Sequence, residues 1–378
     1  MGLPEAPVEV DHIEVAVYRA PIDRPLRTAF GTMVERPAVI VRAIGGDIVG
    51  LGEVWCNFPA CGAEHRARLI ESFLGPLVQR RAWPSPRAAF EHLTAQAHVL
   101  ALQAGEPGPI AQAIAGIDVA LWDLLARRKG MPLWRLLGGR GEARLPAYAS
   151  GINPDGALEQ ARAASADGFC AFKLKIGFGR ERDLDNLASL REGLGADAPI
   201  AVDANQAWSL DEAIGMSRAL ASFEPLWLEE PIAADSPPDD WRRLAAASPI
   251  PLAAGENLRG DQAFDALLET RAVDVIQPDL AKWGGISGCL PLARRIHGAG
   301  LRYCPHYLGG GIGLVASAHL LAAAGGDGML EIDGNPNPLR AGLAMPFPEL
   351  RQGSLLLGDA PGLGVEPDPA IERHRVAA

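Results

Sequence analysis

The segments CAFKLKI at 170–176 and IAVDANQ at 200–206 decide the fold, because each is a short apolar strand and a helical stretch separates them. The same alternation runs through the second half of the chain. Further strand candidates are LPAYAS (145–150), LWLEEP (226–231), PLAAGEN (251–257), VIQPDLA (275–281), LRYCPHY (301–307) and MLEID (329–333). They begin about 25 to 30 residues apart, which is the length of one βα unit. Eight such strands predict a parallel (β/α) barrel rather than an open sheet, because no GxGxxG motif opens the first unit.

The first part of the chain has a different pattern. Residues 8–55 contain alternating, β-rich runs, and the residues after Glu64 place apolar side chains at helical spacing. Strands followed by helices predict an α+β domain over residues 1–140. We therefore expect an N-terminal capping domain at 1–140, a barrel at 141–349, and a C-terminal segment at 350–378 that returns to the cap.

Composition excludes several classes of protein. The 378 residues include 46 Asp and Glu against 35 Lys and Arg, a net charge of −11, and no basic stripe is evident. Binding to nucleic acid or to an anionic membrane is therefore not expected. Five cysteines without a CxxC pair argue against a disulfide framework or a structural zinc site. The N-terminus does not read as a signal peptide and no run of about 18 apolar residues occurs, so we expect a cytoplasmic protein.

Ionisable residues interrupt the predicted strands near their carboxyl ends. In a barrel these ends open on one face, which carries the active site. Buried strands are expected to be apolar, so a charge in seven successive strands indicates function. The residues are Lys173, Lys175, Asp203, Glu229, Glu256, Asp279, His306 and Glu331.

Three of these acids, Asp203, Glu229 and Glu256, come from adjacent strands and can converge on one point. Three carboxylates without thiolates or paired histidines indicate a hard cation, with Mg²⁺ favoured and Mn²⁺ possible. Without a cation, three like charges would repel strongly. Glu230 is expected to point to the opposite side of its strand and to serve as a packing partner.

Two groups of bases are predicted on opposite walls. Lys173 and Lys175 share one face of their strand, and crowding near a cation should depress the pKa of both, so that one can act as a general base. A clamp for phosphate or carboxylate is the competing role. Asp279 is expected to bond the ring of His306 and raise its basicity. Glu331 could donate a hydrogen bond to a substrate carboxylate if its pKa is raised, or could be a loop charge.

Two bases flanking a divalent cation suit one reaction well, the removal of the proton α to a carboxylate. The cation stabilises the enediolate that forms. The bases alone do not determine the fate of the enediolate, so dehydration and racemisation both stay open.

These residues resemble the enolase superfamily, and within it the mandelate racemase subgroup of the mandelate racemase/muconate lactonizing enzyme family. The resemblance runs through KLK (173–175), VDANQ (202–206), LEEP (228–231), GEN (255–257), PDLAKWGG (278–285), PH (305–306), LE (330–331) and GIDVALWDLLARRKGMPLWRLLGG (116–139). It implies a modified TIM barrel, (β/α)7β, under a capping domain. His306 on the seventh strand differs from the muconate-lactonising pattern, in which a lysine on the opposite wall takes the place of the histidine and its aspartate.

The resemblance also implies roles for individual residues. Magnesium would be held by Asp203, Glu229 and Glu256. Lys175 would be one base and the His306–Asp279 dyad the other acid/base. Lys173 would contact the substrate carboxylate, Glu331 would donate a hydrogen bond to it, and Asn205 would help to orient the site.

The sequence leaves the roles of two regions open. The loop CPHYLGGGIGL (304–314) could hold a water, admit a polyol chain or turn tightly, and it is a weak phosphate cradle because no Walker lysine follows. Cap loops at 20–33 and 53–62 are expected to set specificity. Candidate substrate-binding residues in these loops are Arg24, Arg27, Thr28, Trp55 and Asn57. The loops are not strongly apolar, which favours a polyhydroxy acid over an aromatic one.

Four functions compete on this sequence. The first is dehydration of an acid sugar to a 2-keto-3-deoxy acid, and the second is a racemase or epimerase of a 2-hydroxy acid. The third is a non-catalytic barrel that binds acids, against which the intact set of ligands and bases argues. The fourth is a metal-dependent hydrolase, which would need more histidine ligands. A small hydroxy-carboxylate is the expected partner, and a homo-oligomer the expected assembly.

Overall fold

A computed structural model describes residues 2–28 and 31–377, together with their side chains except those of Arg24, Arg27 and Thr28. The second half forms a barrel of parallel strands. Strands β6 to β12 are neighbours in chain order, and β13 pairs back onto β6. The barrel strands are β6 (Arg144–Ile152), β7 (Phe172–Lys175), β8 (Ile200–Asp203), β9 (Leu228–Glu229), β10 (Leu252–Ala254), β11 (Val275–Ile276), β12 (Arg302–Tyr303) and β13 (Leu330–Asp333).

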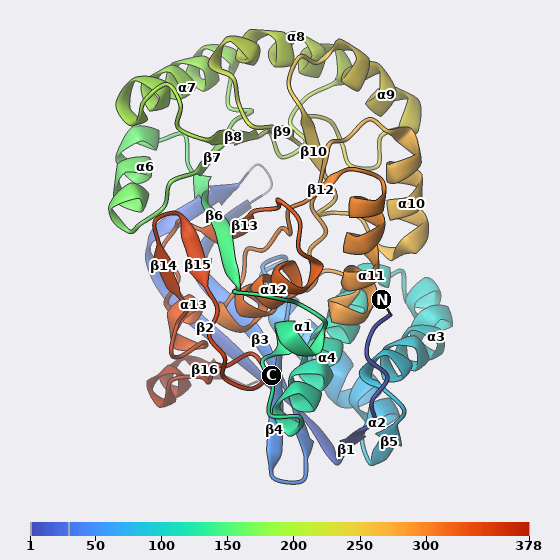
Figure 1. The fold of residues 1–378 in the computed structure, drawn as a ribbon. Coiled ribbons are helices and arrows are strands. Elements are labelled where there is room, and N and C mark those ends of the chain that lie inside the picture. The colour runs from blue at the N-terminus through green and yellow to red at the C-terminus, as the bar shows by residue number, and fades with distance from the viewer. Residues whose placement is uncertain (1, 29–30, 378) are drawn as a thin grey trace.

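A helix follows each of the first seven of these strands within residues 141–377, all of which the structure describes. The helices form an outer layer, and Figure 1 shows α6 to α10 as an arc around the strands. This confirms the predicted (β/α)7β barrel. The helices are α6 (Ala157–Ala166), α7 (Arg180–Leu194), α8 (Leu210–Leu220), α9 (Pro238–Ala247), α10 (Gly260–Thr270), α11 (Gly285–Gly298) and α12 (Gly311–Ala324).

The N-terminal part forms an α+β cap, as predicted. Its main sheet has the order β16-β2-β3-β4, and β1 pairs with β5 beside it. The strands are β1 (Val8–Val10), β2 (His12–Thr28), β3 (Gly31–Gly45), β4 (Ile48–Val54) and β5 (Arg81–Trp83). The helices are α1 (Gly62–Leu69), a π-helical turn (Ile70–Leu74), α2 (Gly75–Val78), α3 (Pro86–Ala104), α4 (Pro107–Arg128) and α5 (Leu133–Leu136).

The C-terminal segment contacts both parts. After α13 (Pro338–Gly342), strand β14 (Glu349–Arg351) pairs with β15 (Ser354–Leu356), and β15 pairs antiparallel with barrel strand β6. The chain then ends with a 3₁₀ turn (Pro369–His374) and β16 (Arg375–Val376), which pairs with β2 of the cap. The limits of the domains at 140 and 349 stay predictions.

Helix α4 joins the cap to the barrel. Most of it is buried, and it packs on β4, β3 and α11. Within the described residues it is the one helix long and apolar enough to cross a membrane, but its apolar window is covered by the fold, as in a core helix.

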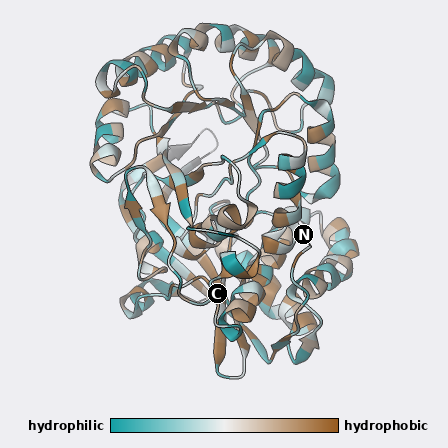
Figure 2. Cartoon of the chain, viewed as in Figure 1, coloured by the Kyte–Doolittle hydropathy of each residue, from teal (hydrophilic) through white to brown (hydrophobic). Residues whose placement is uncertain are grey.

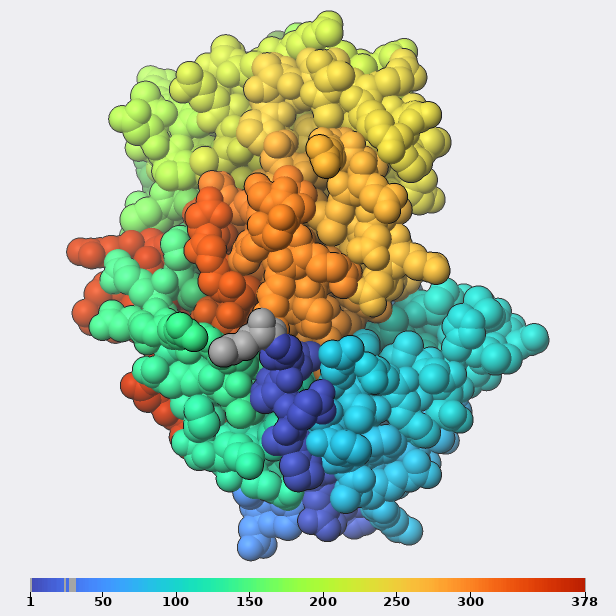
Figure 3. Space-filling view, turned by 45° about the vertical axis from the view of Figure 1, so that its right-hand side comes forward, coloured from blue at the N-terminus to red at the C-terminus, as the bar shows by residue number. Residues whose placement is uncertain are grey.

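Figure 2 shows the apolar residues concentrated in the strands and in the helix faces against them, and Figure 3 shows the cap pressed against the half of the barrel that contains α11.

Buried carboxylates of α4 fix this junction. Asp118 accepts hydrogen bonds from the backbone N–H groups of Ile286 (2.7 Å) and Ser287 (2.9 Å) at the start of α11. Because the first N–H groups of a helix have no partner within the helix, a carboxylate is stabilising there. Asp123 likewise accepts from Leu51 of β4 (2.7 Å) and Leu363 of the C-terminal segment (2.6 Å).

His319, buried in α12, makes the stability of the fold depend on pH. Its Nδ1 accepts from the Trp134 N–H (3.0 Å) and its Nε2 lies 3.1 Å from the Leu363 carbonyl, so the ring is neutral with its proton on Nε2. Burial lowers the pKa of His319 to about 4. A group with a lowered folded-state pKa favours the fold above its unfolded pKa of about 6.5, and that stability is lost as the pH falls toward 4.

We predict that His319→Gln flattens the decline in the free energy of unfolding between pH 6.5 and pH 4. At about 1.4 kcal/mol per pKa unit, His319 should account for about 3 kcal/mol of that decline. Urea unfolding at several pH values measures it. The exposed His98 offers the matched control His98→Gln, which should keep the slope of the unaltered protein. Equal slopes for His319→Gln and the unaltered protein would contradict the assignment.

Candidate active site

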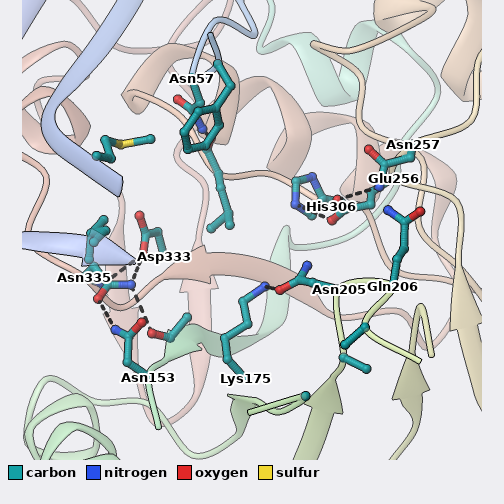
Figure 4. Close-up of a pocket in the computed structure, with 18 of the residues that line it drawn as sticks. Asn57, Asn153, Lys175, Asn205, Gln206, Glu256, Asn257, His306, Asp333 and Asn335 are labelled. Atoms are coloured by element: carbon teal, nitrogen blue, oxygen red, sulfur yellow. Dashed lines mark hydrogen bonds and ion pairs between the residues drawn. The ribbon is translucent and has the colours of Figure 1, made fainter. Parts of the chain in front are cut away.

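A cavity of about 600 Å³ opens at the carboxyl ends of the barrel strands, beneath the cap. Figure 4 shows side chains from several strands pointing into it. Apolar residues of the β2–β3 hairpin and of the segment after β4, including Leu26, Met33 and Trp55, lie on the cap side of the cavity. The barrel side is polar. Its lining includes Asn153, Lys175, Asn205, Gln206, Glu256, Asn257, Lys282, His306, Asp333 and Asn335.

Lys173 lies at the centre of the ion pairs beneath the cavity and is fully buried. Its ammonium contacts Glu229 Oε1 at 2.6 Å and Glu331 Oε1 at 2.7 Å, and lies 3.7 Å from Asp203 Oδ2. A buried ammonium is tolerated only when acids pair with it. The structure thus brings the second, third, fourth and eighth strands together around this one lysine.

Lys175 reaches the cavity itself. Its ammonium donates to Asp203 Oδ2 (2.5 Å) and to Asn205 Oδ1 (2.9 Å). Asp203 and Glu229 are direct partners in the pairing of β8 with β9, and β9 pairs with β10, which leads to Glu256. The three predicted metal ligands therefore come from adjacent strands.

The predicted dyad is present as a hydrogen bond. His306 Nδ1 lies 2.8 Å from Asp279 Oδ2, and Asp279 in turn accepts from the Ala281 N–H at 2.8 Å. On the other side of the ring, Nε2 lies 2.8 Å from Glu256 Oε2. Figure 4 shows His306 and Lys175 entering the cavity from different walls.

The pKa values of both lysines are raised in this structure, which is the opposite of the depression expected beside a cation. Burial lowers the pKa of Lys175, but the Asp203 carboxylate raises it more, so the net shift is upward. Lys173 behaves in the same way, with Glu229 and Glu331 as the acids that raise its pKa. The expectation counted the neighbouring lysine and a cation but not the acids that contact each ammonium.

Two predictions about acids also need correction. Burial raises the pKa of Glu331, but Lys173 and His306 lower it more, so it is an ionised acceptor and not a raised-pKa donor. Glu230 does not point away from the site. Its φ of +37° turns the chain at the end of β9, and its carboxylate accepts from Asn257 Nδ2 at 2.9 and 3.1 Å, beside Glu256.

The cap contributes part of what was expected of it. Trp55 and Asn57 both line the cavity, and Asn57 Nδ2 donates to the Leu308 carbonyl (2.6 Å) just after His306. The side chains of Arg24, Arg27 and Thr28 lie outside the described part of the chain.

The glycine-rich loop after His306 is occupied by a cap carboxylate. Glu53, buried at the end of β4, accepts from the N–H groups of Gly310 (2.5 Å) and Gly313 (2.8 Å). A Cβ on Gly310 would lie 2.6 Å from Glu53 Oε1, and one on Gly313 would lie 2.2 Å from the Tyr307 hydroxyl. The loop was expected to hold a water, admit a polyol chain or turn tightly, and this geometry supports the tight turn. Because Glu53 occupies the N–H groups of Gly310 and Gly313, they are not available to bind a phosphate.

Sequence reasoning missed several residues of the cavity wall, and three of them follow barrel strands. Lys282 Nζ lies 3.2 Å from Glu256 Oε1 and 5.2 Å from the centre of the Trp55 ring. Asn153 and Asn335 face the cavity after β6 and β13. The rule that strand ends carry function could have identified all three, but their residue types are common in ordinary loops.

The carboxylates fit a divalent cation by their chemistry rather than by a prearranged geometry. Within residues 2–28 and 31–377, no three His, Cys, Asp or Glu side chains surround a common point as metal ligands. The oxygens of Asp203, Glu229 and Glu256 contact lysines and His306 instead.

The lysines and His306 nevertheless do not neutralise all of the acids at the end of the barrel. Burial and then Asp203 raise the pKa of Glu229 to about 7, and burial and then Glu256 raise that of Glu230 well above its usual range. An all-oxygen site with this deficit suits Mg²⁺.

Two family models match the chain and together span most of it. Residues 12–138 match the mandelate racemase/muconate lactonizing enzyme N-terminal domain, and residues 156–371 match the enolase C-terminal domain-like model.

Solved structures share the whole architecture. A mandelate racemase/muconate lactonizing enzyme from Bordetella bronchiseptica RB50 is 53% identical, with a TM-score of 0.92 over 97% of this chain and 99% of that one. A racemase from Streptomyces coelicolor A3(2) with bound magnesium is 27% identical, with a TM-score of 0.88 over 97% and 100%.

Curated relatives match at about one third identity. D-galactarolactone cycloisomerase from Agrobacterium fabrum is 33% identical over 91% of this chain and 93% of its own length. Arabinonate dehydratase from Saccharolobus solfataricus is 33% identical over 78% and 79%. With both family models matched in order, the chain belongs to the mandelate racemase/muconate lactonizing enzyme family of the enolase superfamily.

Proposed function

We propose that this enzyme uses Mg²⁺ to remove the proton α to the carboxylate of an acid sugar and then eliminates the β hydroxyl, giving a 2-keto-3-deoxy acid. The observation that carries the proposal is the placement of two bases, Lys175 and the His306–Asp279 dyad, on different walls of one cavity. An arabinonate dehydratase among the relatives supports the acid-sugar class.

Each side chain has its own part in the reaction. Lys175 or His306 takes the α proton, and His306, held by Asp279, gives a proton to the departing hydroxyl. Asn205 orients the Lys175 ammonium through its 2.9 Å bond. Lys173 attracts the substrate carboxylate, and its contact with Glu331 keeps it in place. The roles of Lys175, His306 and Asn205 follow from their positions on the cavity wall, whereas Lys173 is buried beneath the cavity and acts on the substrate through its charge.

The proposed metal ligands are Asp203, Glu229 and Glu256. When bound, Mg²⁺ stabilises the negative charge that develops on the substrate carboxylate. The chain's own acids keep both bases protonated in this structure. Burial lowers the pKa of His306, but Glu256 and Glu331 raise it to about 10, and Asp203 acts similarly on Lys175. A cation bound by Asp203 and Glu256 would offset their negative charge, and the pKa values of Lys175 and His306 would then fall.

A second candidate is cycloisomerisation, in which a ring oxygen leaves in place of a hydroxyl. It is favoured by the coverage of the D-galactarolactone cycloisomerase match, which exceeds that of the dehydratase. Both reactions begin with the same α-proton removal, so the same two bases serve either. A dehydration product is lighter than its substrate by one water, whereas an isomer keeps the mass.

Racemisation stays open for the same reason. Incubation with aldonic acids, aldaric acids and their lactones plus Mg²⁺ separates the candidates. A 2-keto acid with loss of water indicates dehydration, and a keto acid of unchanged mass indicates cycloisomerisation. Exchange of the α proton in D₂O without a keto acid indicates racemisation. No product and no exchange on any acid would contradict the proposal.

We predict that Lys175→Ala and His306→Asn each lower turnover by about 10² to 10⁴-fold, because each removes one of the two acid/base groups. Steady-state assays of keto-acid formation measure the loss, and α-proton exchange shows which base acts first. Lys129→Ala, on an exposed helix end, is the control and should keep full activity. If neither variant changes turnover or exchange, the assignment of the bases is wrong.

We predict that EDTA abolishes turnover and that Mg²⁺ restores it. The cation should also raise the melting temperature, because it binds only the folded protein and offsets repulsion among Asp203, Glu229 and Glu256. Asp203→Asn should lose the thermal shift. Asp239→Asn, on the exposed surface of α9, should keep it. Reactivation by Zn²⁺ but not by Mg²⁺ would count against this site.

We also propose a cytoplasmic homo-oligomer. The five cysteines are unpaired, which suits a reducing compartment. Val99 and Leu102 on α3 are 64% and 63% exposed, and such apolar side chains suit burial against a second copy. Light scattering after gel filtration gives the mass, and a monomer at micromolar concentration would rule the oligomer out.

A further inference from the structure

Asn153 and Asn335 form an amide pair on the wall of the cavity away from His306 (Figure 4). Asn153 follows β6 and Asn335 follows β13, and these strands are parallel neighbours. Asn153 Nδ2 donates to Asn335 Oδ1 at 2.9 Å. Figure 4 places Lys175 between this pair and His306. An acid whose α carbon lies near Lys175 can therefore extend its far end toward the pair.

The orientation of the Asn335 amide is fixed by two acceptors. Its Nδ2 donates to the Gly151 carbonyl (3.1 Å) and to Asp333 Oδ1 (2.9 Å), so neither of its protons is free. Gly151 permits this approach, since a Cβ there would lie 2.5 Å from Asn335 Nδ2. Asn335 Oδ1 accepts one hydrogen bond and can accept a second.

The orientation of the Asn153 amide is fixed as well. Gln160 Oε1 accepts from the Asn153 backbone N–H (3.1 Å), and Gln160 Nε2 donates to the Asp155 carbonyl (2.6 Å), so the Gln160 oxygen must face Asn153. Asn153 Nδ2 then donates to Gln160 Oε1 (3.2 Å) and to Asn335. Both of its protons are used, while Asn153 Oδ1 has no donor among the described residues.

Among the described residues, the Asn153–Asn335 pair itself therefore offers two acceptor oxygens and no free amide proton. A ligand group that suits it must bring its own proton, as a hydroxyl does. A carboxylate brings only acceptors and would meet the negative ends of two amide dipoles. The charge of each described cation on the cavity wall is already offset by an acid, because Arg36, Lys175 and Lys282 are paired with Asp333, Asp203 and Glu256.

We propose that the Asn153–Asn335 pair is the subsite for hydroxyl groups at the far end of the substrate, and that it selects aldonic acids, which end in CH₂OH, over aldaric acids, which end in a second carboxylate. The inference rests on the proposed function and names its substrate class. The cavity of about 600 Å³ is large enough for a six-carbon acid.

The test compares hexonates with the hexarates of the same configuration, using the Mg²⁺-loaded full chain. The unaltered enzyme should show kcat/KM at least about tenfold higher for the hexonate, the value of one hydrogen bond. Asn153→Ala should lower kcat/KM for hexonates by about tenfold and leave α-proton exchange of glycerate, which has no distal carbons, unchanged. Asn335→Ala should act in the same direction.

Asn186→Ala is the matched control. Its amide bonds the Pro154 carbonyl (3.0 Å) in the same loop but does not line the cavity, so neither substrate should be affected. A hexarate used as well as its hexonate overturns the subsite while leaving the proposed function intact, and this comparison needs no variant to fold. Equal losses on hexonate and glycerate in Asn153→Ala would show a structural role and also overturn it. No turnover or exchange with any acid would overturn the proposed function and the subsite together.

Discussion

The buried ammonium of Lys173 is the constraint on which the barrel mouth depends. Its contacts with Glu229 (2.6 Å) and Glu331 (2.7 Å) join β7, β9 and β13, which lie in different parts of the barrel wall. Removing one partner from such a buried group costs about 3 to 5 kcal/mol, so each acid requires the lysine as much as the lysine requires the acids. Glu331 also accepts from the Tyr307 N–H (3.1 Å), so the segment that carries His306 is held by the same cluster.

The cap is joined to the barrel by another kind of buried ionic contact, in which a carboxylate accepts from backbone N–H groups at the start of a helix. Glu53 binds N–H groups at the start of α12, and Asp118 binds N–H groups at the start of α11. Glu53 lies two residues before Trp55, and its partners lie just after His306. The cap wall of the cavity and the dyad are therefore fixed to each other through one short path, and the cap is a structural part of the site.

The repeat of the βα unit made much of this predictable. Because parallel strands present their carboxyl ends on one face, the position of a charge within its strand was enough to bring Lys173, Asp203 and Glu229 together. The charge states were not predictable in this way. Spacing gives the strand and the face, but the pKa of a buried lysine depends on the atoms within about 4 Å of it, which only the folded geometry supplies.

The amide pair was missed for a related reason. Asparagine is frequent in turns, so Asn153 and Asn335 give no signal until β13 is seen to pair with β6. Likewise, the turn at Glu230 breaks the alternation of side chains expected of a regular strand. Strand periodicity holds inside a strand and fails just beyond its last residue, which is where a barrel enzyme carries its chemistry.

Chemistry and recognition occupy different strands. The acid/base groups come from β7 and from the segments after β11 and β12, whereas the amide pair comes from the ends of β6 and β13, where the barrel closes. Asn153 and Asn335 are fixed by backbone carbonyls, by Gln160 and by Asp333, and no hydrogen bond among the described residues links them directly to the lysine cluster. Substitutions at sites that share no partners have additive effects on free energy. The far wall can therefore be altered to accept other substrates while Lys173 continues to hold the acids that organise the reaction.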